Sequence, residues 1–535
     1  MRRDNLASLG FALLLVVGPD VDVSATAAEC TVTSLQTRAP KGTTVTAAVP
    51  VQPNDGAPAH CEVDGTVATA GNNVTFRLGL PSLWNDKFLF EGVGGFGGTA
   101  ASLRPGMDRG YAAASTDTGH RGGATDAAWA ANSPAKKVDY AHRGTHVAVV
   151  AAKALTEAYY GRASRHAYFD GCSNGGRQAL MEAQRYPEDF DGIVAGDPSF
   201  GALGNLRRTL IYQTLLSSGE HVLPAGKVTL LSRAVLESCD AADGLKDGLI
   251  TDPRACAFRP ETLLCTGEDR PDCLTAGQVE SVHAIYGSVP GPAGRMLPGF
   301  PQGHEEGRTG WPQWITGSTE PVRRADGQLT FEGNAPLGFR FMDGYLRHLA
   351  FPDDNPEFDW RTFSFERHGT RLSPFLEDVS PTGTDLSALR HRGGKLLLYH
   401  GWADPALSAF STVSYYEEVV EHAGGQKNSD QFVALFMVPG MHHCQGNGPG
   451  PNTFDALGTL DGWVERGVAP VRIVASHIAS GVIDRTRPLC RYPYVARYVG
   501  SGSIDAADNF QCEAPASRGA TRPLAGASQE RAPGR

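Results

Sequence analysis

Several hallmarks of other protein classes are missing from this 535-residue sequence. It has no Cys-x-x-Cys pair and no Cys/His cluster, which disfavours a zinc site. It has no dense basic run and carries a formal net charge of −10, which argues against nucleic acid or an anionic membrane as a partner. No internal repeat is evident. Hydrophobic residues (41%) and charged residues (20%) occur at fractions ordinary for a soluble globular protein, and the many glycines (64) and prolines (35) indicate a chain rich in turns.

A long hydrophobic run is also missing. The apolar stretch at 9–17 is too short to span a bilayer. It follows Arg2 and Arg3 and precedes the small residues of 25–27, an order typical of a secretory signal peptide. We therefore expect residues 1–28 to be a signal peptide cleaved near residue 27 or 28, and the mature chain to be secreted or periplasmic.

Export makes the ten cysteines informative, because an even number of cysteines in an oxidising compartment favours disulfides. Local spacing suggests four pairs, although spacing alone does not fix the connectivity. Two cysteines far apart in sequence, Cys172 and Cys444, are left over. The suggested local pairs are Cys30–Cys61, Cys239–Cys256, Cys265–Cys273 and Cys490–Cys512.

Nearly continuous apolar segments alternate with amphipathic helical patterns, which predicts an α/β fold with a mostly parallel sheet covered on both faces. The expected strands lie in 87–95, 110–117, 165–171, 192–198, 394–401 and 431–440, and the helices in 143–161, 175–187 and 407–424. Residues 203–388 do not follow this alternation of strands and helices and are rich in cysteines, prolines and aromatics. We interpret them as an inserted lid domain. The core is then 29–202 plus 389–512, followed by a tail, 513–535, that we expect to be disordered.

The stretch "YFDGCSNGGRQ" (168–178) contains a G-x-S-x-G pattern between an expected strand and an expected helix. This context is typical of a nucleophile elbow, in which a sharp turn lifts a serine hydroxyl above the sheet. Ser173 is the candidate nucleophile. The neighbouring Cys172 is a weaker candidate, because a nucleophilic thiol would leave Cys444 unexplained.

A serine nucleophile needs a base that is oriented by a carboxylate, and in chains with this elbow the order is Ser, then Asp or Glu, then His. Asp404 follows the expected strand at 394–401, and His443 follows the next one. His442 is the fallback base and His400 a weaker one. If Cys172 and Cys444 bond, the disulfide ties the backbone beside the nucleophile to the backbone beside the base.

Two further segments carry candidate site residues. The oxyanion hole should combine the N–H of Asn174 with one from the glycine-rich segment 91–98, where Gly95 is the first choice and Gly94 the second. A nucleotide-binding interpretation of that segment is disfavoured by the lack of a Walker lysine. The acidic loop "CDAADGLKDGLI" (239–250) suits either a Ca²⁺ ion or a solvated turn equally well by composition.

Together, "GCSNGG" (171–176), "DGLKDG" (243–248), "HGWADP" (400–405) and "HHC" (442–444) resemble the tannase/feruloyl esterase family of secreted α/β-hydrolases, which includes MHETase-like enzymes. The similarity covers nearly the whole mature chain. It implies the triad Ser173, Asp404 and His443 with a Cys172–Cys444 bond beneath it. It also implies a structural lid Ca²⁺ held by the side chains of Asp240, Asp243 and Asp247 and the carbonyls of Leu245 and Leu249.

The resemblance implies an esterase acting on aromatic or plant-polymer-derived esters, first of all feruloyl (hydroxycinnamoyl) esters, through an acyl-enzyme. Tannase activity on galloyl esters is the alternative, and hydrolysis of a terephthalate monoester is a third. From other classes, a calcium-dependent binding protein on an inactive hydrolase scaffold and a secreted serine peptidase remain open. We expect no nucleic-acid or membrane partner; the oligomeric state is not predicted.

Overall fold

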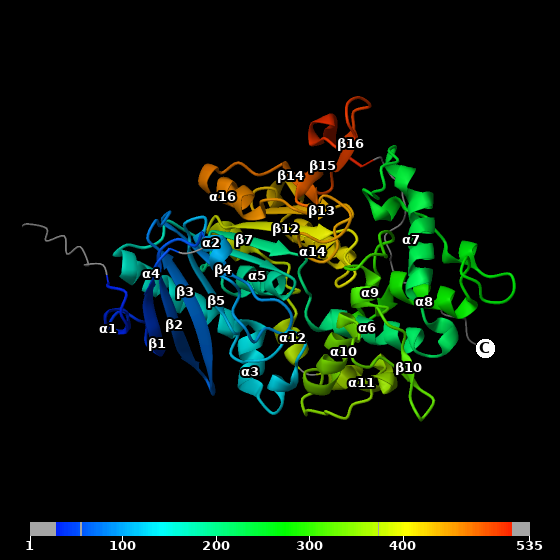
Figure 1. Ribbon diagram of the computed structural model, residues 1–535. Coiled ribbons are helices and arrows are strands. Elements are labelled where there is room, and N and C mark those ends of the chain that lie inside the picture. Colours follow the sequence, from blue (N-terminus) through cyan, green and yellow to red (C-terminus); the bar gives the residue numbers. More distant parts are fainter. Residues whose placement is uncertain (1–27, 54–55, 373, 516–535) are drawn as a thin grey trace, which may run out of the picture.

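The computed structural model describes residues 28–53, 56–372 and 374–515. The expected signal peptide (1–27) and most of the expected tail (516–535) lie outside these residues. Nine strands form one sheet in the order β1-β2-β3-β5-β4-β6-β7-β12-β13, which extends from the left side to the middle of Figure 1. Within the described residues, none of the helices combines the length and the apolar character that a membrane crossing requires.

Six neighbouring strands of this sheet are parallel, and three amino-terminal strands extend it in antiparallel fashion. Every strand expected from an apolar run is present. The parallel strands are β4 (Lys87–Glu91), β5 (Ala112–Thr116), β6 (His166–Cys172), β7 (Gly192–Gly196), β12 (Lys395–Gly401) and β13 (Val433–Val438). The antiparallel ones are β1 (Thr43–Val51), β2 (His60–Thr69) and β3 (Asn72–Pro81).

Side chains from alternate positions of the parallel strands enter two separate hydrophobic clusters, one on each face of the sheet. One face packs on helices α4 (Gly144–Tyr160), α5 (Asn174–Arg185) and α14 (Ala409–His422). The other packs on α16 (Ala456–Arg466), whose Leu460 and Trp463 are buried against β7 and β12. Covering both faces explains why apolar residues run almost continuously through these strands.

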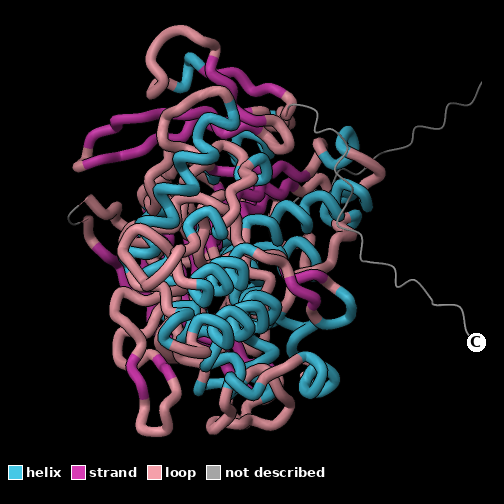
Figure 2. Tube along the Cα trace, turned by 90° about the vertical axis from the view of Figure 1, so that its right-hand side faces the viewer, coloured by secondary structure: helices cyan, strands magenta, loops and turns pink. Residues whose placement is uncertain are grey.

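The segment between β7 and β12 adds no strand to the sheet and packs around a further hydrophobic cluster, which it shares with residues such as Phe96, Trp129 and Tyr140 of the core. Figure 2 shows its helices gathered in front of the sheet. Residues near its two ends meet: a Cβ on Gly201 would lie 2.5 Å from the carbonyl oxygen of Val379. Its helices are α6 (Ala202–Leu215), α7 (Ala225–Cys239), α8 (Ala276–Tyr286), α9 (Trp311–Trp314), α10 (Leu337–His348), α11 (Phe365–His368), α12 (Phe375–Val379) and α13 (Ser387–His391).

Shorter elements complete the structure. Two small hairpins lie in the inserted segment, and two lie at the carboxyl end beyond α16. They comprise β8 (Val289–Pro290) with β9 (Met296–Leu297), β10 (Val322–Arg323) with β11 (Leu329–Thr330), β14 (Arg472–Ala479) with β15 (Val482–Cys490), and β16 (Val495–Tyr498) with β17 (Phe510–Glu513). The short helices are α1 (Val32–Gln36), α2 (Arg104–Met107), α3 (Pro134–Val138) and α15 (Gln426–Ser429).

All ten cysteines are disulfide-bonded. The four local pairs are those that spacing suggests: Cys30–Cys61, Cys239–Cys256, Cys265–Cys273 and Cys490–Cys512. The fifth, Cys172–Cys444, joins cysteines 272 residues apart. It links the end of β6 to the loop after β13, and these loops meet at one edge of the sheet.

Candidate active site

Ser173 occupies a strained turn between β6 and α5. Its φ of 66° is a left-handed value that non-glycine residues rarely adopt. The turn is tight because glycines let the chain approach itself: a Cβ on Gly171 would lie 2.6 Å from the carbonyl carbon of Gly175. The Ser173 N–H donates to the carbonyl oxygen of Gly196 at 2.9 Å, which anchors the turn to β7. This is the geometry expected of a nucleophile elbow.

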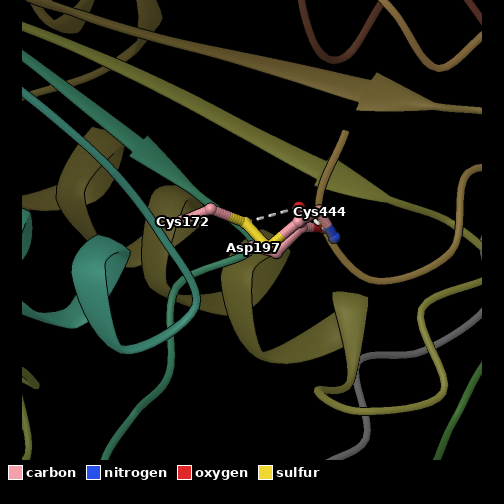
Figure 3. Close-up of side chains that lie close together, drawn as sticks. All are labelled: Cys172, Asp197 and Cys444. Atoms are coloured by element: carbon pink, nitrogen blue, oxygen red, sulfur yellow. Dashed lines mark hydrogen bonds between the residues drawn. A yellow bond between two sulfur atoms is a disulfide. The ribbon is translucent and has the colours of Figure 1, made fainter. Parts of the chain in front are cut away.

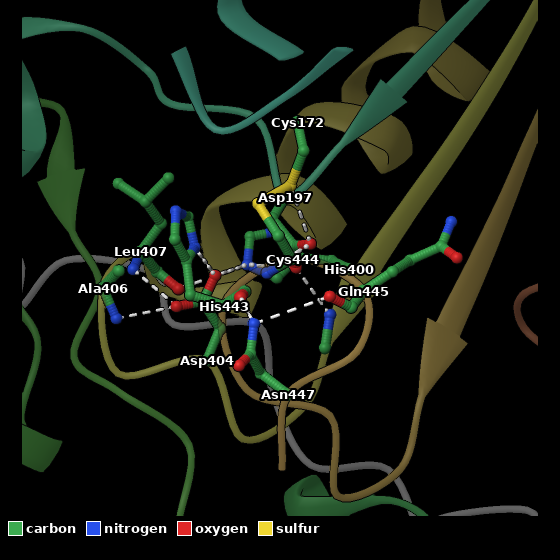
Figure 4. Close-up of a disulfide and its surroundings, with 11 residues drawn as sticks. Cys172, Asp197, His400, Asp404, Ala406, Leu407, His443, Cys444, Gln445 and Asn447 are labelled. Atoms are coloured by element: carbon green, nitrogen blue, oxygen red, sulfur yellow. Dashed lines mark hydrogen bonds and ion pairs between the residues drawn. A yellow bond between two sulfur atoms is a disulfide. The ribbon is translucent and has the colours of Figure 1, made fainter. Parts of the chain in front are cut away.

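Asp404 and His443 lie in the loops after β12 and β13 and contact each other (Figure 4). The His443 Nδ1–H donates to Asp404 Oδ2 at 2.8 Å, which leaves the imidazole Nε2 as a proton acceptor. The other Asp404 oxygen, Oδ1, accepts from the N–H groups of Ala406 (2.7 Å) and Leu407 (3.0 Å). His443 and Ser173 line one cavity of about 50 Å³.

The electrostatic environment keeps Asp404 ionised. Burial acts to raise its pKa, but the charge of His443 and hydrogen bonds from His400 and His443 outweigh burial and hold the pKa below its ordinary value. A carboxylate that stays ionised keeps the His443 ring in one tautomer and stabilises the imidazolium that forms when the ring accepts a proton. The arrangement therefore suits His443 to act as a general base.

The Cys172–Cys444 disulfide joins the residue before Ser173 to the residue after His443, with a Cα–Cα distance of 6.0 Å. Figure 3 shows this bond beside the carboxylate of Asp197. A covalent link directly next to both side chains limits how far the two loops can move apart. The cysteine beside Ser173 is thus part of the scaffold.

Asp197 is a site residue that the sequence analysis did not single out. It follows β7, is fully buried and has a φ of 36°. Its Oδ1 accepts from the N–H of Gly401 (2.8 Å) and its Oδ2 from the N–H of Cys444 (3.2 Å). Asp197 thereby holds the loops that carry Asp404 and His443. Its place after an expected strand, in "GIVAGDP" (192–198), was the available signal.

The two alternative histidines are engaged elsewhere. His442 is buried, with Nδ1 at 2.8 Å from the Thr309 hydroxyl and Nε2 at 2.9 Å from the carbonyl oxygen of His304. Burial lowers its pKa. His400 is fully buried and lies 3.2 Å from Asp404, on Nε2, with Nδ1 at 2.7 Å from the Thr412 hydroxyl. Neither ring lines the cavity of Ser173, whereas His443 does.

The candidate oxyanion donors, Gly95 and Asn174, line the same cavity. Gly95 has a φ of 60°, and a Cβ there would lie 2.4 Å from the carbonyl oxygen of Ala124, so the position requires glycine. Asn174 opens α5, where backbone N–H groups have no partner within the helix. The Asn174 side chain donates to the carbonyl oxygen of Val93 (2.8 Å), which ties the two candidate donor segments together.

Aromatic side chains form much of the cavity wall and come from both the core and the inserted segment. Trp314 packs edge-on against His443 with ring centroids 4.9 Å apart and stacks on Phe341 with an interplanar angle of 8°. Phe341 in turn contacts Phe96 of the core at 5.1 Å. The inserted segment therefore covers the site and supplies flat apolar surfaces next to the candidate nucleophile.

The acidic loop lies in the inserted segment, away from this cavity. Asp243, Leu245, Asp247 and Leu249 line a small cavity of about 10 Å³, and their carboxylate and carbonyl oxygens are donors that suit a hard cation. Asp240 does not line it; its Oδ2 accepts from the N–H of Gly248 at 3.0 Å. The Asp247 carboxylate is also ion-paired with Arg487. Four of the five expected ligands thus line one small cavity.

Comparisons with known proteins agree with this architecture. A family profile described as "Tannase and feruloyl esterase" matches residues 61–513. An uncharacterized esterase of Xanthomonas campestris is 36% identical, and the mono(2-hydroxyethyl) terephthalate hydrolase of Piscinibacter sakaiensis is 34% identical; each alignment covers 86% of this chain and 85% of the relative.

Solved structures give the same result. The crystal structure of feruloyl esterase B from Aspergillus oryzae matches with a TM-score of 0.77 at 27% identity, over 89% of this chain and 97% of that chain. The tannin acyl hydrolase from Aspergillus niger matches with a TM-score of 0.68 at 22% identity, over 91% and 97%, which supports the fold alone. The chain has an α/β-hydrolase fold and belongs to the tannase and feruloyl esterase family of carboxylic ester hydrolases.

Proposed function

We propose that this protein is a secreted serine esterase that hydrolyses esters of aromatic acids, with feruloyl esters as the first candidate substrates. The observation that carries the proposal is the pair of His443 and Asp404, joined by a 2.8 Å hydrogen bond, in one cavity with Ser173 at its strained turn. A disulfide directly beside Ser173 and His443 supports it further.

In the proposed mechanism, the Ser173 hydroxyl attacks the ester carbonyl carbon while Nε2 of His443 accepts its proton. The negative charge that develops on the carbonyl oxygen is stabilised by the N–H groups of Asn174 and Gly95. His443 then protonates the departing alkoxide, which leaves as the alcohol, and Ser173 is acylated. Water attacks the acyl-enzyme with His443 again as base, and the acid leaves as Ser173 recovers its proton.

The acyl group is proposed to lie among the aromatic rings of the cavity. Trp314 and Phe341 offer flat faces, and aromatic pairs favour stacked or edge-on contacts worth about 0.5–1.5 kcal/mol beyond their buried area. Feruloyl, galloyl and terephthaloyl groups are all planar. The Aspergillus oryzae feruloyl esterase and the terephthalate monoester hydrolase among the relatives motivate testing all three classes.

The decisive experiment measures hydrolysis of methyl ferulate, methyl gallate and mono(2-hydroxyethyl) terephthalate by the wild type and by Ser173→Ala. We expect methyl ferulate to have the highest kcat/KM and the substitution to lower kcat by at least about 10³-fold while the denaturation midpoint is retained. Ser217→Ala, at an exposed position in the turn that follows α6, is the control. A Ser173→Ala variant with most of its turnover would refute the mechanism.

The same assays separate the other classes. A binding protein on an inactive scaffold would hydrolyse none of the esters and would resist labelling by a serine-directed phosphonate. A serine peptidase would cleave peptides but fail on small esters. A preference for methyl gallate or for the terephthalate monoester would move the assignment to the corresponding alternative within the family.

A structural Ca²⁺ is proposed for the acidic loop, held by the side chains of Asp243 and Asp247 and the carbonyl oxygens of Leu245 and Leu249. Asp240 would complete the set. An ion there would offset the crowding of carboxylates and hold the loop against the carboxyl-terminal hairpins, from which Arg487 reaches it. No part of the ester chemistry depends on it.

Secretion or export to the periplasm is proposed on the strength of the five disulfides, since such bonds persist in oxidising compartments. The amino-terminal sequencing of exported protein would test this, with a mature end near residue 28 or 29 expected. A chain that keeps residues 1–27 and stays in the reducing cytoplasm would contradict it.

A further inference from the structure

A second, larger cavity of about 540 Å³ lies next to the candidate active site. It is bounded by α6, the hairpin β8–β9 and α14, and its walls include the apolar side chains of Phe200, Leu203 and Phe300. It shares two wall residues with the cavity of Ser173, namely Ala406 and Leu407. These are the residues whose N–H groups hold the Asp404 carboxylate.

Three charged side chains line this cavity, of which Arg295 and Glu418 are exposed and one is buried. Arg207, on α6, is 4% exposed, and its Nη2 donates to carbonyl oxygens at the carboxyl end of α8, including that of Gly287 at 2.6 Å. Its Nε has no hydrogen-bond partner. No carboxylate of the described residues forms an ion pair with Arg207, and burial lowers its pKa to about 10, so the group is still charged at neutral pH.

A buried charge without a counter-ion is unfavourable, and such charges in proteins are usually paired. The helix-end carbonyls supply only partial negative charge. An anion bound in the cavity would complete the pairing, because a guanidinium has further N–H donors for a carboxylate. The apolar walls would bind the rest of the molecule, so the ligand must have both a carboxylate and an apolar body.

We propose that this cavity is a binding site for an amphipathic aromatic carboxylate, whose ring lies between Phe200, Leu203 and Phe300 and whose carboxylate pairs with Arg207. The site is separate from the cavity of Ser173. That the natural ligand is the acid released by ester hydrolysis rests on the proposed function, whereas binding itself requires no turnover. A bound acid would contact Leu407 and hence the segment that holds Asp404.

Gly204, also in the wall, offers a way to fill the cavity without disturbing the charge. A Cβ at this helical position meets only Leu407 Cδ2, at 3.8 Å, an ordinary contact. Gly204→Leu therefore introduces a side chain where the ligand ring would lie. Gly226 in α7 is a matched control, because it is helical and a Cβ there meets nothing within 4 Å.

The test is calorimetric titration of ferulate, and of the uncharged feruloyl amide, into Ser173→Ala protein, which cannot turn over ester. We expect ferulate to bind at least tenfold more tightly than the amide. Adding Gly204→Leu should raise the Kd for ferulate at least tenfold, and adding Gly226→Leu should leave it unchanged. Adding Arg207→Met should remove the preference for ferulate over the amide.

Either equal affinity for ferulate in the Gly204→Leu and Gly226→Leu proteins or equal affinity of the parent for acid and amide overturns the proposal. Absence of ferulate binding up to millimolar concentration does so too. Because Arg207 is buried, its variant can be unstable, and Gly204→Leu then decides alone. A wild type that hydrolyses no aromatic ester would refute the proposed function but would leave these binding measurements as they are.

Discussion

Removing the Cys172–Cys444 disulfide should damage both stability and turnover. The bond closes a loop of 272 residues, for which the chain-entropy relation gives about 5.6 kcal/mol of stabilisation as an upper value. The substitution Cys172→Ala together with Cys444→Ala removes this constraint. It also frees the backbone beside Ser173 and His443, and a displacement of about 1 Å in a catalytic group can cost about 10²-fold in rate.

A matched control is the Cys490–Cys512 bond, which closes only 22 residues and does not line the cavity of Ser173. The same relation gives about 3.4 kcal/mol for it. We expect Cys490→Ala with Cys512→Ala to lower the urea midpoint but to leave kcat on methyl ferulate near the wild-type value.

The assay is kcat at a temperature where both variants are fully folded, with the active fraction counted by phosphonate labelling. We expect kcat to fall about 10²-fold only in the Cys172/Cys444 variant. If both variants lose stability and both keep the wild-type kcat, the Cys172–Cys444 disulfide contributes to stability alone. The reasoning that it positions Ser173 against His443 is then refuted.

Three further predictions concern the same scaffold. Gly95→Ala should lower kcat at least about 10²-fold, because the new Cβ would lie 2.4 Å from the carbonyl oxygen of Ala124. Gly94→Ala, whose Cβ would have nothing within 4 Å, should leave kcat nearly unchanged. A loss of kcat in Gly94→Ala but not in Gly95→Ala would make Gly94 the oxyanion donor. Burial raises the pKa of Asp197 from 3.8 to about 6, so between about pH 6 and pH 4 this carboxyl binds a proton more readily in the folded protein than in the unfolded chain. As the pH falls through this range, the wild type should therefore gain stability relative to Asp197→Asn. Urea midpoints of the two proteins that differ by a constant amount across the range would contradict this. Chelation with EGTA should lower the Tm, and Ca²⁺ at about 100 times its Kd should restore about 2.7 kcal/mol, with kcat of the folded enzyme unchanged; an unaltered Tm would exclude a structural Ca²⁺.

The parallel core was predictable because strands buried on both faces carry nearly continuous apolar runs, as 396–399 ("LLLY") does in β12. The positions of Asp404 and His443 were predictable for a related reason, since the carboxyl ends of neighbouring parallel strands meet at one edge. The antiparallel strands β1–β3 were not identified. In β2 buried and partly exposed positions alternate, as with Val63 and Asp64, so the strand lacks the continuous apolar run by which the parallel strands were identified.

Asp197 could not be recognised as a site residue, because an Asp-Pro pair after a strand is also an ordinary turn signal. Its role depends on accepting N–H groups from Gly401 and Cys444, which are more than 200 residues away in sequence. The cavity beside Arg207 is likewise assembled from α6, β9 and α14. Contacts of this kind depend on tertiary packing, and neither periodicity nor local spacing encodes them.

The meeting of Gly201 with Val379 has a consequence for how such enzymes diversify. A long inserted segment whose ends lie next to each other can be replaced by that of a relative as one unit. Such a replacement needs two junctions and leaves the strands of the sheet intact. Substrate preference could then change by recombination while the hydrolytic apparatus beneath stays constant. Chimaeras joined at these two positions would be natural starting points for engineering new ester selectivity.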